Sequence, residues 1–274
     1  MHSPVARLAA PIAIALVAAC SDVGRSREAI QGGVPATDYP EAVYVTSEGF
    51  IPCSGVLLAP TVVLSAGHCR GNGTSFVVTA PNAGNVTVTG SRSWSPFDDD
   101  VATSSDVLLI FLDAPIQIAS YPTLSPTEVA PGTSVVDIGR TLNGSIDTND
   151  YVSPPVTIQG DATPLGFPYN YEALPDISED GDSGGPIVLQ GTHTIVAIVD
   201  TDTVEQSIQE TTPIDLFARI DVVKDAIDEQ IASNGETASG GCSVAAARGS
   251  RGAVLALVAW VLAFLARRSR VNTP

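Results

Sequence analysis

The chain has 274 residues and a formal net charge of −17 at pH 7, and its length suffices for one or two domains with a hydrophobic core. Residues 30–234 contain 27 Asp and Glu but only 5 Lys and Arg. Such an acidic segment excludes nucleic acid as a partner, because phosphates are bound by Lys and Arg. It fits a soluble, secreted domain in which the acidity serves solubility, and attraction of cationic partners is the alternative.

The first 19 residues are predicted to be a signal peptide. Arg7 precedes an apolar run over residues 8–19, which is too short to span a membrane as a mature helix. Cys20 follows the residues Val-Ala-Ala, and this ending resembles the lipobox of bacterial lipoproteins, in which the cysteine is lipidated after cleavage. Ordinary signal cleavage near the same site is the alternative.

The C-terminal end is predicted to be a second targeting signal. Residues 235–252 are a linker with a Gly-Gly-Cys motif ending at Cys242, and residues 253–270 combine a short apolar run with three arginines. This order resembles the C-terminal sorting tails of myxobacterial surface proteins, which are processed near the cysteine. A plain tail anchor and a buried helix are the alternatives, and the arginines disfavour the buried helix. Both ends predict export to the cell surface, outer membrane or exterior of a Gram-negative bacterium, with membrane contact through the terminal segments.

Between these ends, short apolar runs rich in Val, Ile and Thr alternate with Gly, Pro, Asn and Asp. The runs predict strands, and their spacing indicates an all-β antiparallel barrel or sandwich. Cys53 and Cys69 lie among them and are the candidate disulfide of an exported domain, since Cys20 and Cys242 belong to the end signals. The predicted strands are residues 42–46, 54–67, 75–80, 85–90, 105–112, 133–139, 155–160, 185–191 and 194–200.

A single helix is predicted near the end of the acidic segment. Val223, Ile227 and Ile231 recur every four residues and form an apolar stripe. Asp221 is the expected N-terminal cap, and Asn234-Gly235 suits a left-handed stop. We expect the stripe to pack on the sheet and close the domain.

The segment "GDSGGP" places Ser183 between small residues, as a nucleophile requires. A serine becomes a nucleophile when a base takes its proton and a third group orients that base. Of the three histidines, His2 lies in the signal peptide and His193 in a polar turn expected to face solvent. His68, which directly follows an apolar run and adjoins Cys69, is therefore the candidate base.

Asp106 is the candidate orienting carboxylate. It opens an apolar run that predicts a buried strand, where a carboxylate is costly without a hydrogen-bonded partner. Asp98, Asp99 and Asp100 form a polar run that predicts a solvated loop, with a calcium ligand set as the alternative, and Asp113 is a turn residue.

The order of these residues excludes an α/β-hydrolase, although "GDSGG" satisfies the nucleophile-elbow motif of that fold. An α/β-hydrolase needs a helix after the serine and then an acid before the histidine. Here a strand-like run follows Ser183, and no carboxylate stands between Ser183 and His193.

Three blocks, "LSAGHC", "SDVLLIFLDAP" and "GDSGGP", resemble the signature segments of the trypsin-like serine endopeptidases, in the same order of roles. The similarity extends over residues 30–234. It implies two antiparallel six-stranded β-barrels with a C-terminal α-helix. It also implies a His68, Asp106 and Ser183 triad, with an oxyanion hole made by the N–H groups of Gly181 and Ser183.

The segment "EAIQGG" resembles the activation site of that family. There, an activating protease cuts before Ile30, and the new amine pairs with Asp182. Residues 20–29 are then a propeptide. The residue before the cut is Ala29 rather than the basic residue that the family commonly has, so we expect either another kind of activating protease or trimming after cleavage at Arg27.

The resemblance places the substrate pocket at Ile177, six residues before the nucleophile, with walls near Asp200 and Asp202. An isoleucine at the floor disfavours selection of Arg or Lys by charge, and we expect a small or medium apolar side chain at the cleaved position. The acids at the rim could still attract a basic side chain.

The sequence therefore predicts a monomeric, exported serine endopeptidase that acts on polypeptides and needs no cofactor or metal. The alternative hypothesis is a non-catalytic binding module on the same fold.

Overall fold

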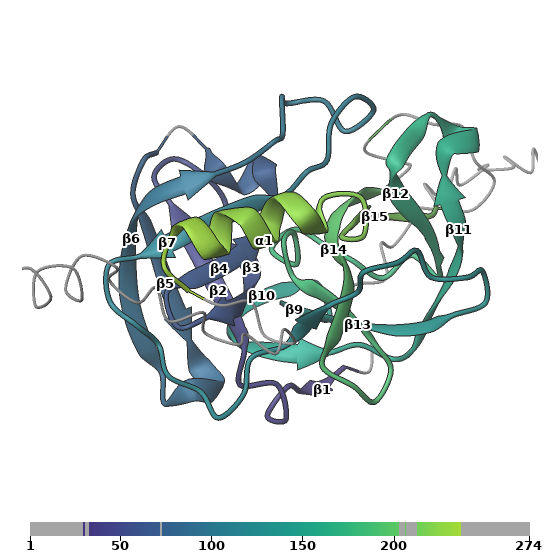
Figure 1. Ribbon diagram of the computed structural model, residues 1–274. Helices are drawn as coiled ribbons and strands as arrows, with labels where there is room; N and C mark the ends of the chain where they lie inside the picture. Colours follow the sequence, from purple (N-terminus) through teal and green to yellow (C-terminus); the bar gives the residue numbers. More distant parts are fainter. Residues whose placement is uncertain (1–29, 31–32, 72, 203–205, 207–212, 237–274) are drawn as a thin grey trace, which may run out of the picture.

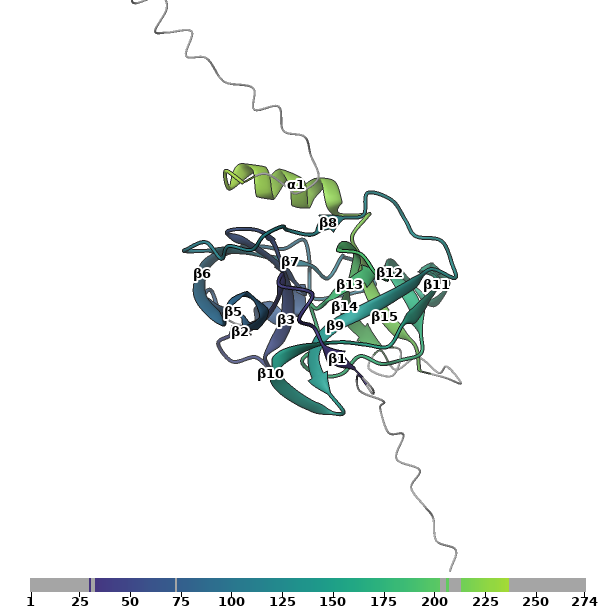
Figure 2. The same ribbon diagram turned by 90° about the horizontal axis from the view of Figure 1, so that it is seen from below.

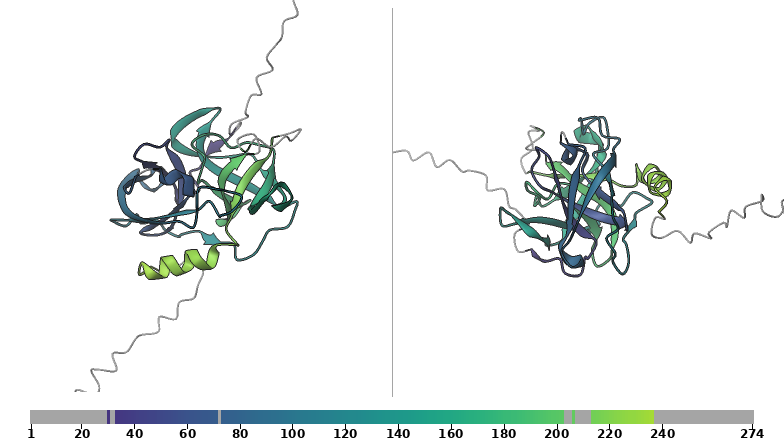
Figure 3. Two further views of the ribbon diagram at one scale, coloured as in Figure 1. Left: turned by 90° about the horizontal axis from the view of Figure 1, so that it is seen from above. Right: turned by 90° about the vertical axis from the view of Figure 1, so that its left-hand side faces the viewer.

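The computed structural model describes residue 30, residues 33–71 and 73–202, residue 206 and residues 213–236. Two β-barrels stand side by side, and one helix lies along the outside of the first (Figure 1). The views from below and above show the same arrangement (Figures 2 and 3). The prediction of an all-β protein with two antiparallel six-stranded barrels and a C-terminal helix is confirmed.

The first barrel closes through six antiparallel strands. The residues of β3, β4 and β7 are all buried, which explains why they read as continuous apolar runs. The single run predicted over residues 54–67 is two strands, because Pro60 cannot donate a backbone hydrogen bond to the sheet and a turn forms there. In barrel order the strands are β2 (Ala42–Ser47), β3 (Cys53–Ala59), β4 (Val62–Ser65), β7 (Leu108–Leu112), β6 (Val86–Trp94) and β5 (Phe76–Ala80).

The second barrel closes where β13 pairs with β9. Outside the ring, β10 (Ser145–Val152) pairs with β9, β1 (Val34–Pro35) pairs with β10, and β8 (Thr123–Leu124) runs parallel to β14. The ring consists of β9 (Ser134–Leu142), β11 (Val156–Ala162), β12 (Phe167–Leu174), β15 (Asp215–Arg219), β14 (Thr194–Asp202) and β13 (Pro186–Leu189).

The strand pattern missed β10, β12 and β15, and the two-residue strands β1 and β8. The sequence of β10, "SIDTNDYV", has no apolar alternation, and that of β12 holds a proline and an asparagine. Both strands form because neighbouring strands supply hydrogen-bonding partners, which a local sequence pattern does not record.

The helix α1 (Lys224–Ser233) packs on the first barrel, although the chain enters it from β15 of the second (Figures 1 and 2). Ile227 and Ile231 are buried in the same core cluster as the strands of the first barrel, as predicted. Gly235 adopts the expected left-handed conformation, with φ of 83°. The predicted cap is wrong: Val223 occupies the N-cap position, and the Asp221 carboxylate instead accepts hydrogen bonds from Arg219 and Tyr171.

The predicted disulfide is confirmed. Cys53 at the start of β3 is bonded to Cys69 in the short 3-10 helix η1 (Gly67–Arg70), with 6.2 Å between their Cα atoms. The bond ties η1, which carries His68, to the barrel wall.

The predicted terminal signals lie outside the described residues. These are the signal peptide of residues 1–19, the propeptide of residues 20–29 with Cys20, the sorting motif with Cys242, and the hydrophobic segment 253–270. The described part of the chain contains no helix of the length and apolarity that crossing a membrane requires.

Replacing Ile227 by alanine tests the packing of α1. The Ile227 side chain is fully buried, so truncation should lower the free energy of unfolding by about 2–5 kcal/mol. Val222→Ala is the matched control, because Val222 is 43% exposed and its change should stay within about 0.5 kcal/mol. Urea unfolding measures both, and equal effects of the two changes would contradict the docked helix.

Candidate active site

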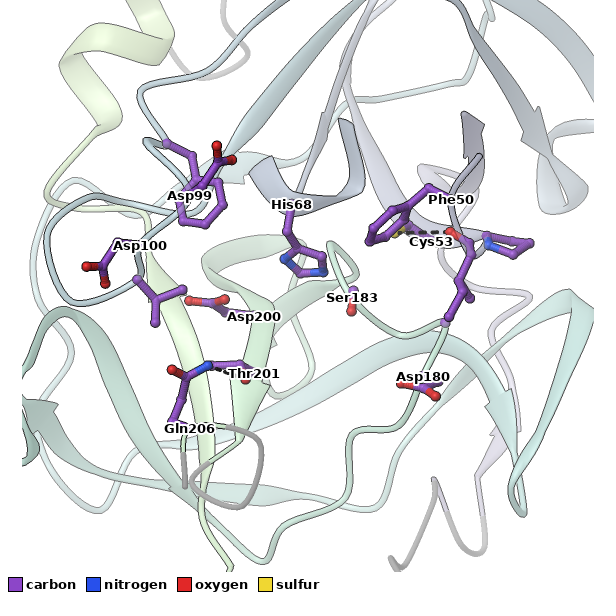
Figure 4. Close-up of a pocket in the computed structure, with 15 residues that line it drawn as sticks. Phe50, Cys53, His68, Asp99, Asp100, Asp180, Ser183, Asp200, Thr201 and Gln206 are labelled. Atoms are coloured by element: carbon purple, nitrogen blue, oxygen red, sulfur yellow. Dashed lines mark hydrogen bonds between the residues drawn. The ribbon is translucent and has the colours of Figure 1, made fainter. Parts of the chain in front are cut away.

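A cavity of about 370 Å³ opens between the two barrels. The first barrel contributes His68 and Cys53 to its lining, and the second contributes Ser183 and Asp200. Figure 4 shows the imidazole of His68 and the side chain of Ser183 at its centre. The loop residues Asp99 and Asp100 line its other side. Residues far apart in the sequence thus meet at one surface hollow.

The pairing of β4 with β7 brings His68 and Asp106 together. Ser65 at the end of β4 pairs with Leu108 at the start of β7, so η1 and the residues before β7 leave the barrel at the same point. The backbone N–H of His68 donates to Asp106 Oδ1 at 2.8 Å, and His68 Nδ1 lies 2.5 Å from Asp106 Oδ2. A Cβ at Gly67 would lie 2.7 Å from Asp106 Oδ1, so only glycine permits this approach.

The hydrogen bonds determine the charge state of Asp106. Its carboxylate is fully buried, and the side chain of His68 is 28% exposed. Burial acts to raise the pKa of Asp106, but the hydrogen bonds and charge of His68 outweigh it and hold the pKa below its ordinary value. Because the ionised carboxylate can only accept, Nδ1 carries the proton and the neutral ring has its lone pair on Nε2, where a base needs it.

The turn that carries Ser183 is held from behind by the first barrel and by β9. The N–H of Ser54 donates to the carbonyl of Ser183 at 2.9 Å, and the Ser54 hydroxyl donates to the carbonyl of Gly181 at 2.9 Å. The Thr141 hydroxyl donates to the carbonyl of Asp180 at 2.8 Å. A trans peptide points its N–H opposite to its carbonyl, so this last bond turns the Gly181 N–H away from Thr141.

Within the described part of the chain, the N–H groups of Gly181 and Ser183 donate to no other residue. Both residues line the cavity. Gly181 has φ of 102°, a conformation that favours glycine. Two unoccupied donors beside a serine hydroxyl are the arrangement that stabilises an oxyanion.

Gly184 has φ of 79°, and a Cβ there would lie 2.3 Å from Ser65 Oγ. The turn therefore packs directly against β4, which fixes the position of Ser183 relative to His68.

Asp182 and Ile30 approach the same strand. Asp182 is fully buried and accepts the N–H of Thr141 at 2.7 Å and of Glu179 at 3.1 Å. Ile30 is fully buried and bridges to Leu142, the residue after Thr141. Burial raises the pKa of Asp182 to about 7, against the lowering effect of the backbone hydrogen bonds. A positive charge nearby would favour its ionised form.

The floor of the expected substrate pocket differs from the prediction. Ile177 is 7% exposed and packs in the core cluster of the second barrel, and its N–H donates to Asp215 Oδ2 at 2.9 Å. Asp215 of β15 lines a small pocket beside Ser183, together with Asp200 and Asp202. A carboxylate therefore stands where the sequence predicted an apolar floor.

The remaining candidates lie elsewhere. His193 is exposed, as predicted, but its Nδ1 lies 2.5 Å from the buried Glu41. Asp98 accepts hydrogen bonds from Thr103 and Ser104 within its loop.

Two groups in the described residues have metal-ligand spacing. One contains the disulfide-bonded Cys53 and Cys69, and the other is His68 with Asp106 and Asp200.

Comparison with known proteins identifies the family. The Trypsin family model matches residues 30–227. The chain belongs to the trypsin family. A solved structure of the inactivated protease paralogue S-I1 of the scabies mite has the same fold, with a TM-score of 0.59 at 20% sequence identity. That match covers 73% of this chain and 99% of the other.

Sequence reasoning missed several residues that hold this trypsin-family site. Ser54 and Thr141 fix the turn of Ser183 from 127 and 39 residues away, and no local pattern marks them. The sequence does contain a signal for Asp215: it is the one acid in the largely apolar segment "PIDLFARI", where an acid needs a structural or functional reason.

Buried carboxyl groups should make stability depend on pH. Burial raises the pKa of Asp150 to about 7, although Arg140 opposes the shift. In the unfolded chain the value is about 3.9, so the folded state binds more protons and stability falls as pH rises from about 4 to about 7. With residues before Ile30 intact, the melting temperature should be higher at pH 5.5 than at pH 7.5.

Asp150→Asn should reduce this difference, because it removes the titrating group. Asp113→Asn is the control, since Asp113 is exposed and its pKa is lowered by hydrogen bonds from Ser91 and Thr89, so it stays ionised across this range. Differential scanning calorimetry measures both. A melting temperature that rises with pH would contradict the argument.

Proposed function

We propose that the protein is an exported serine endopeptidase that cleaves polypeptides through an acyl-enzyme intermediate. The supporting observation is that Asp106 holds His68 by two hydrogen bonds while Ser183 lines the same cavity. Membership of the trypsin family supports the same chemistry.

In the proposed mechanism, Ser183 Oγ attacks the scissile carbonyl carbon and passes its proton to His68 Nε2. The oxyanion is bound by the N–H groups of Gly181 and Ser183. The C–N bond then breaks as His68 returns the proton to the leaving amine. Water, deprotonated by His68, then attacks the ester carbon, and the acyl C–Oγ bond breaks as His68 returns the proton to Ser183 Oγ and the carboxylic acid leaves. Asp106 keeps Nδ1 protonated and stabilises the imidazolium at both steps.

The proposal also covers how the enzyme is activated and where it acts. Cleavage by an activating protease before Ile30 would free an amine close to Asp182, since Ile30 bridges to the strand that donates to Asp182. The predicted terminal signals support a site at the cell surface, outer membrane or exterior of a Gram-negative bacterium. The location is independent of the chemistry at Ser183.

Labelling with a fluorophosphonate tests the nucleophile. The chain starting at Ile30 should gain one adduct, and peptide mass spectrometry should place it on Ser183. Ser183→Ala should abolish labelling and reduce turnover on the order of a million-fold, as in comparable triads. Ser91→Ala is the matched control, because Ser91 is an exposed serine of β6, and it should label normally.

The alternative function is a non-catalytic binding module. The scabies mite structure supports this alternative, because it is an inactivated protease paralogue with the same fold. The two functions predict opposite results in the same assay. A folded chain that starts at Ile30, fails to label and cleaves no peptide would favour binding over catalysis.

The pocket beside Ser183 favours a basic side chain at the cleaved position. Its described lining includes five carboxylates and no Lys or Arg: Glu179, Asp180, Asp200, Asp202 and Asp215. Asp202 and Asp215 are paired across β14 and β15 and are both buried, so a bound cation would offset the cost that burial places on their ionised forms.

Peptides that differ only at the cleaved residue test this preference. Lys and Arg should be cleaved with a kcat/KM about 10- to 100-fold above Ala and Leu, from charged hydrogen bonds worth about 1.5–3 kcal/mol. Asp215→Asn keeps an acceptor for the Ile177 N–H and should remove most of that preference while leaving apolar substrates unchanged. If the wild-type enzyme prefers Ala or Leu, the proposed preference for basic residues is wrong and the apolar pocket predicted from the sequence is supported.

A further inference from the structure

Asp200, the seventh residue of β14, places a third functional group against His68 and Asp106. Ligand atoms of His68, Asp106 and Asp200 all lie within 4.8 Å of one another. Asp106 is fully buried and Asp200 is 4% exposed. In Figure 4 the Asp200 carboxylate lies on the second-barrel side of the imidazole. Two buried carboxyl groups therefore adjoin at the base of the site.

Two carboxyl groups so close in a buried place do not both ionise, because the second charge meets both desolvation and repulsion. Asp106 is the better place for the charge, since it accepts the backbone N–H and Nδ1–H of His68. The Oδ2 atom of Asp200 accepts a hydrogen bond from an uncharged donor, the Asn170 amide, at 2.6 Å.

We propose that Asp200 is a positioning residue that keeps a proton at neutral pH and donates it in a hydrogen bond to Asp106. The active site is then a chain of four residues, running from Asp200 through Asp106 and His68 to Ser183. This inference rests on the proposed function, because positioning matters only if His68 acts as a base. A hydrogen bond from Asp200 is among the causes that lower the pKa of Asp106.

The surroundings of Asp200 favour its neutral form. Asn170 of β12 is uncharged and His68 of η1 is paired with Asp106. Asp202 of β14 and Asp215 of β15 are further acids on the substrate-pocket side, and neither would stabilise a negative charge on Asp200. The described residues that line the two neighbouring cavities include no Lys or Arg that would stabilise an ionised Asp200.

The proposed bond has a functional consequence. A donated O–H fixes the Asp106 carboxylate so that its two oxygens face the two N–H groups of His68. Ionisation of Asp200 at alkaline pH would remove this bond and repel Asp106. The rate should therefore fall at high pH through a group that is neither His68 nor the amine of Ile30.

Two substitutions separate the hydrogen bond that Asp200 donates from the ionisation of its carboxyl group. Asp200→Asn keeps an N–H donor toward Asp106 and an acceptor for Asn170 but does not titrate. Its kcat at pH 7.5 should stay within about fivefold of the wild-type value, and its alkaline decline should lose one ionisation. Asp200→Ala lacks the donor, and its kcat should fall about 10- to 100-fold with a smaller change in KM, as expected for a lost hydrogen bond to a charged group.

The experiment compares pH profiles of kcat and kcat/KM for wild type, both variants and Asp113→Asn, whose exposed carboxyl serves as the control. Equal losses in the Asn and Ala variants, or superimposable wild-type and Asn profiles, would overturn the proposal. If wild type itself neither cleaves nor labels, the proposed function fails instead.

An infrared difference titration of the Ser183→Ala chain gives a readout that needs no catalysis. A protonated carboxyl band that disappears in Ser183→Ala with Asp200→Asn supports the proposal. An unchanged band overturns it, even if Asp200→Ala proves unstable.

Discussion

The hydrogen bonds between the buried Asp106 carboxylate and His68 are the interaction on which the site depends. A carboxylate without exposure is costly unless donors compensate its charge, and two N–H groups of one residue supply that compensation. Several local features follow from this pairing. Gly67 has no side chain because a Cβ would collide with the carboxylate, and the disulfide at Cys69 holds the segment that donates.

The turn that carries Ser183, the other half of the site, is held by the same kind of contact from both barrels. Ser54 of the first barrel and Thr141 of the second donate to carbonyls of the turn, and the buried Asp182 of the second barrel accepts the N–H groups of Thr141 and Glu179. The second barrel also contains Asp137 and Asp215, whose pKa values are raised well above the ordinary range, chiefly by burial and then by neighbouring acids. Part of the acidity seen in the sequence is therefore internal to the second barrel.

The apolar runs of Val, Ile and Leu predicted an all-β protein and the four-residue stripe predicted the helix, because both are direct signatures of burial. The two barrels followed from the resemblance of three motifs to the trypsin-like serine endopeptidases. The sequence also singled out His68, Asp106 and Ser183, since each lies at the edge of such a run or in a distinctive motif. Prediction failed where contacts depend on strand register. The floor of the pocket is an example. Asp215 reaches the pocket from β15 and accepts the N–H of Ile177, whose side chain lies in the core.

Observation of the His68 Nδ1 proton by NMR tests the central claim most directly. In the chain that starts at Ile30, a proton held between the ring and an ionised, buried carboxylate should resonate far downfield and exchange slowly with water. Asp106→Asn should abolish that signal. An Nδ1 proton with the shift and rapid exchange of a solvent-exposed imidazole, or one unaffected by Asp106→Asn, would contradict the account.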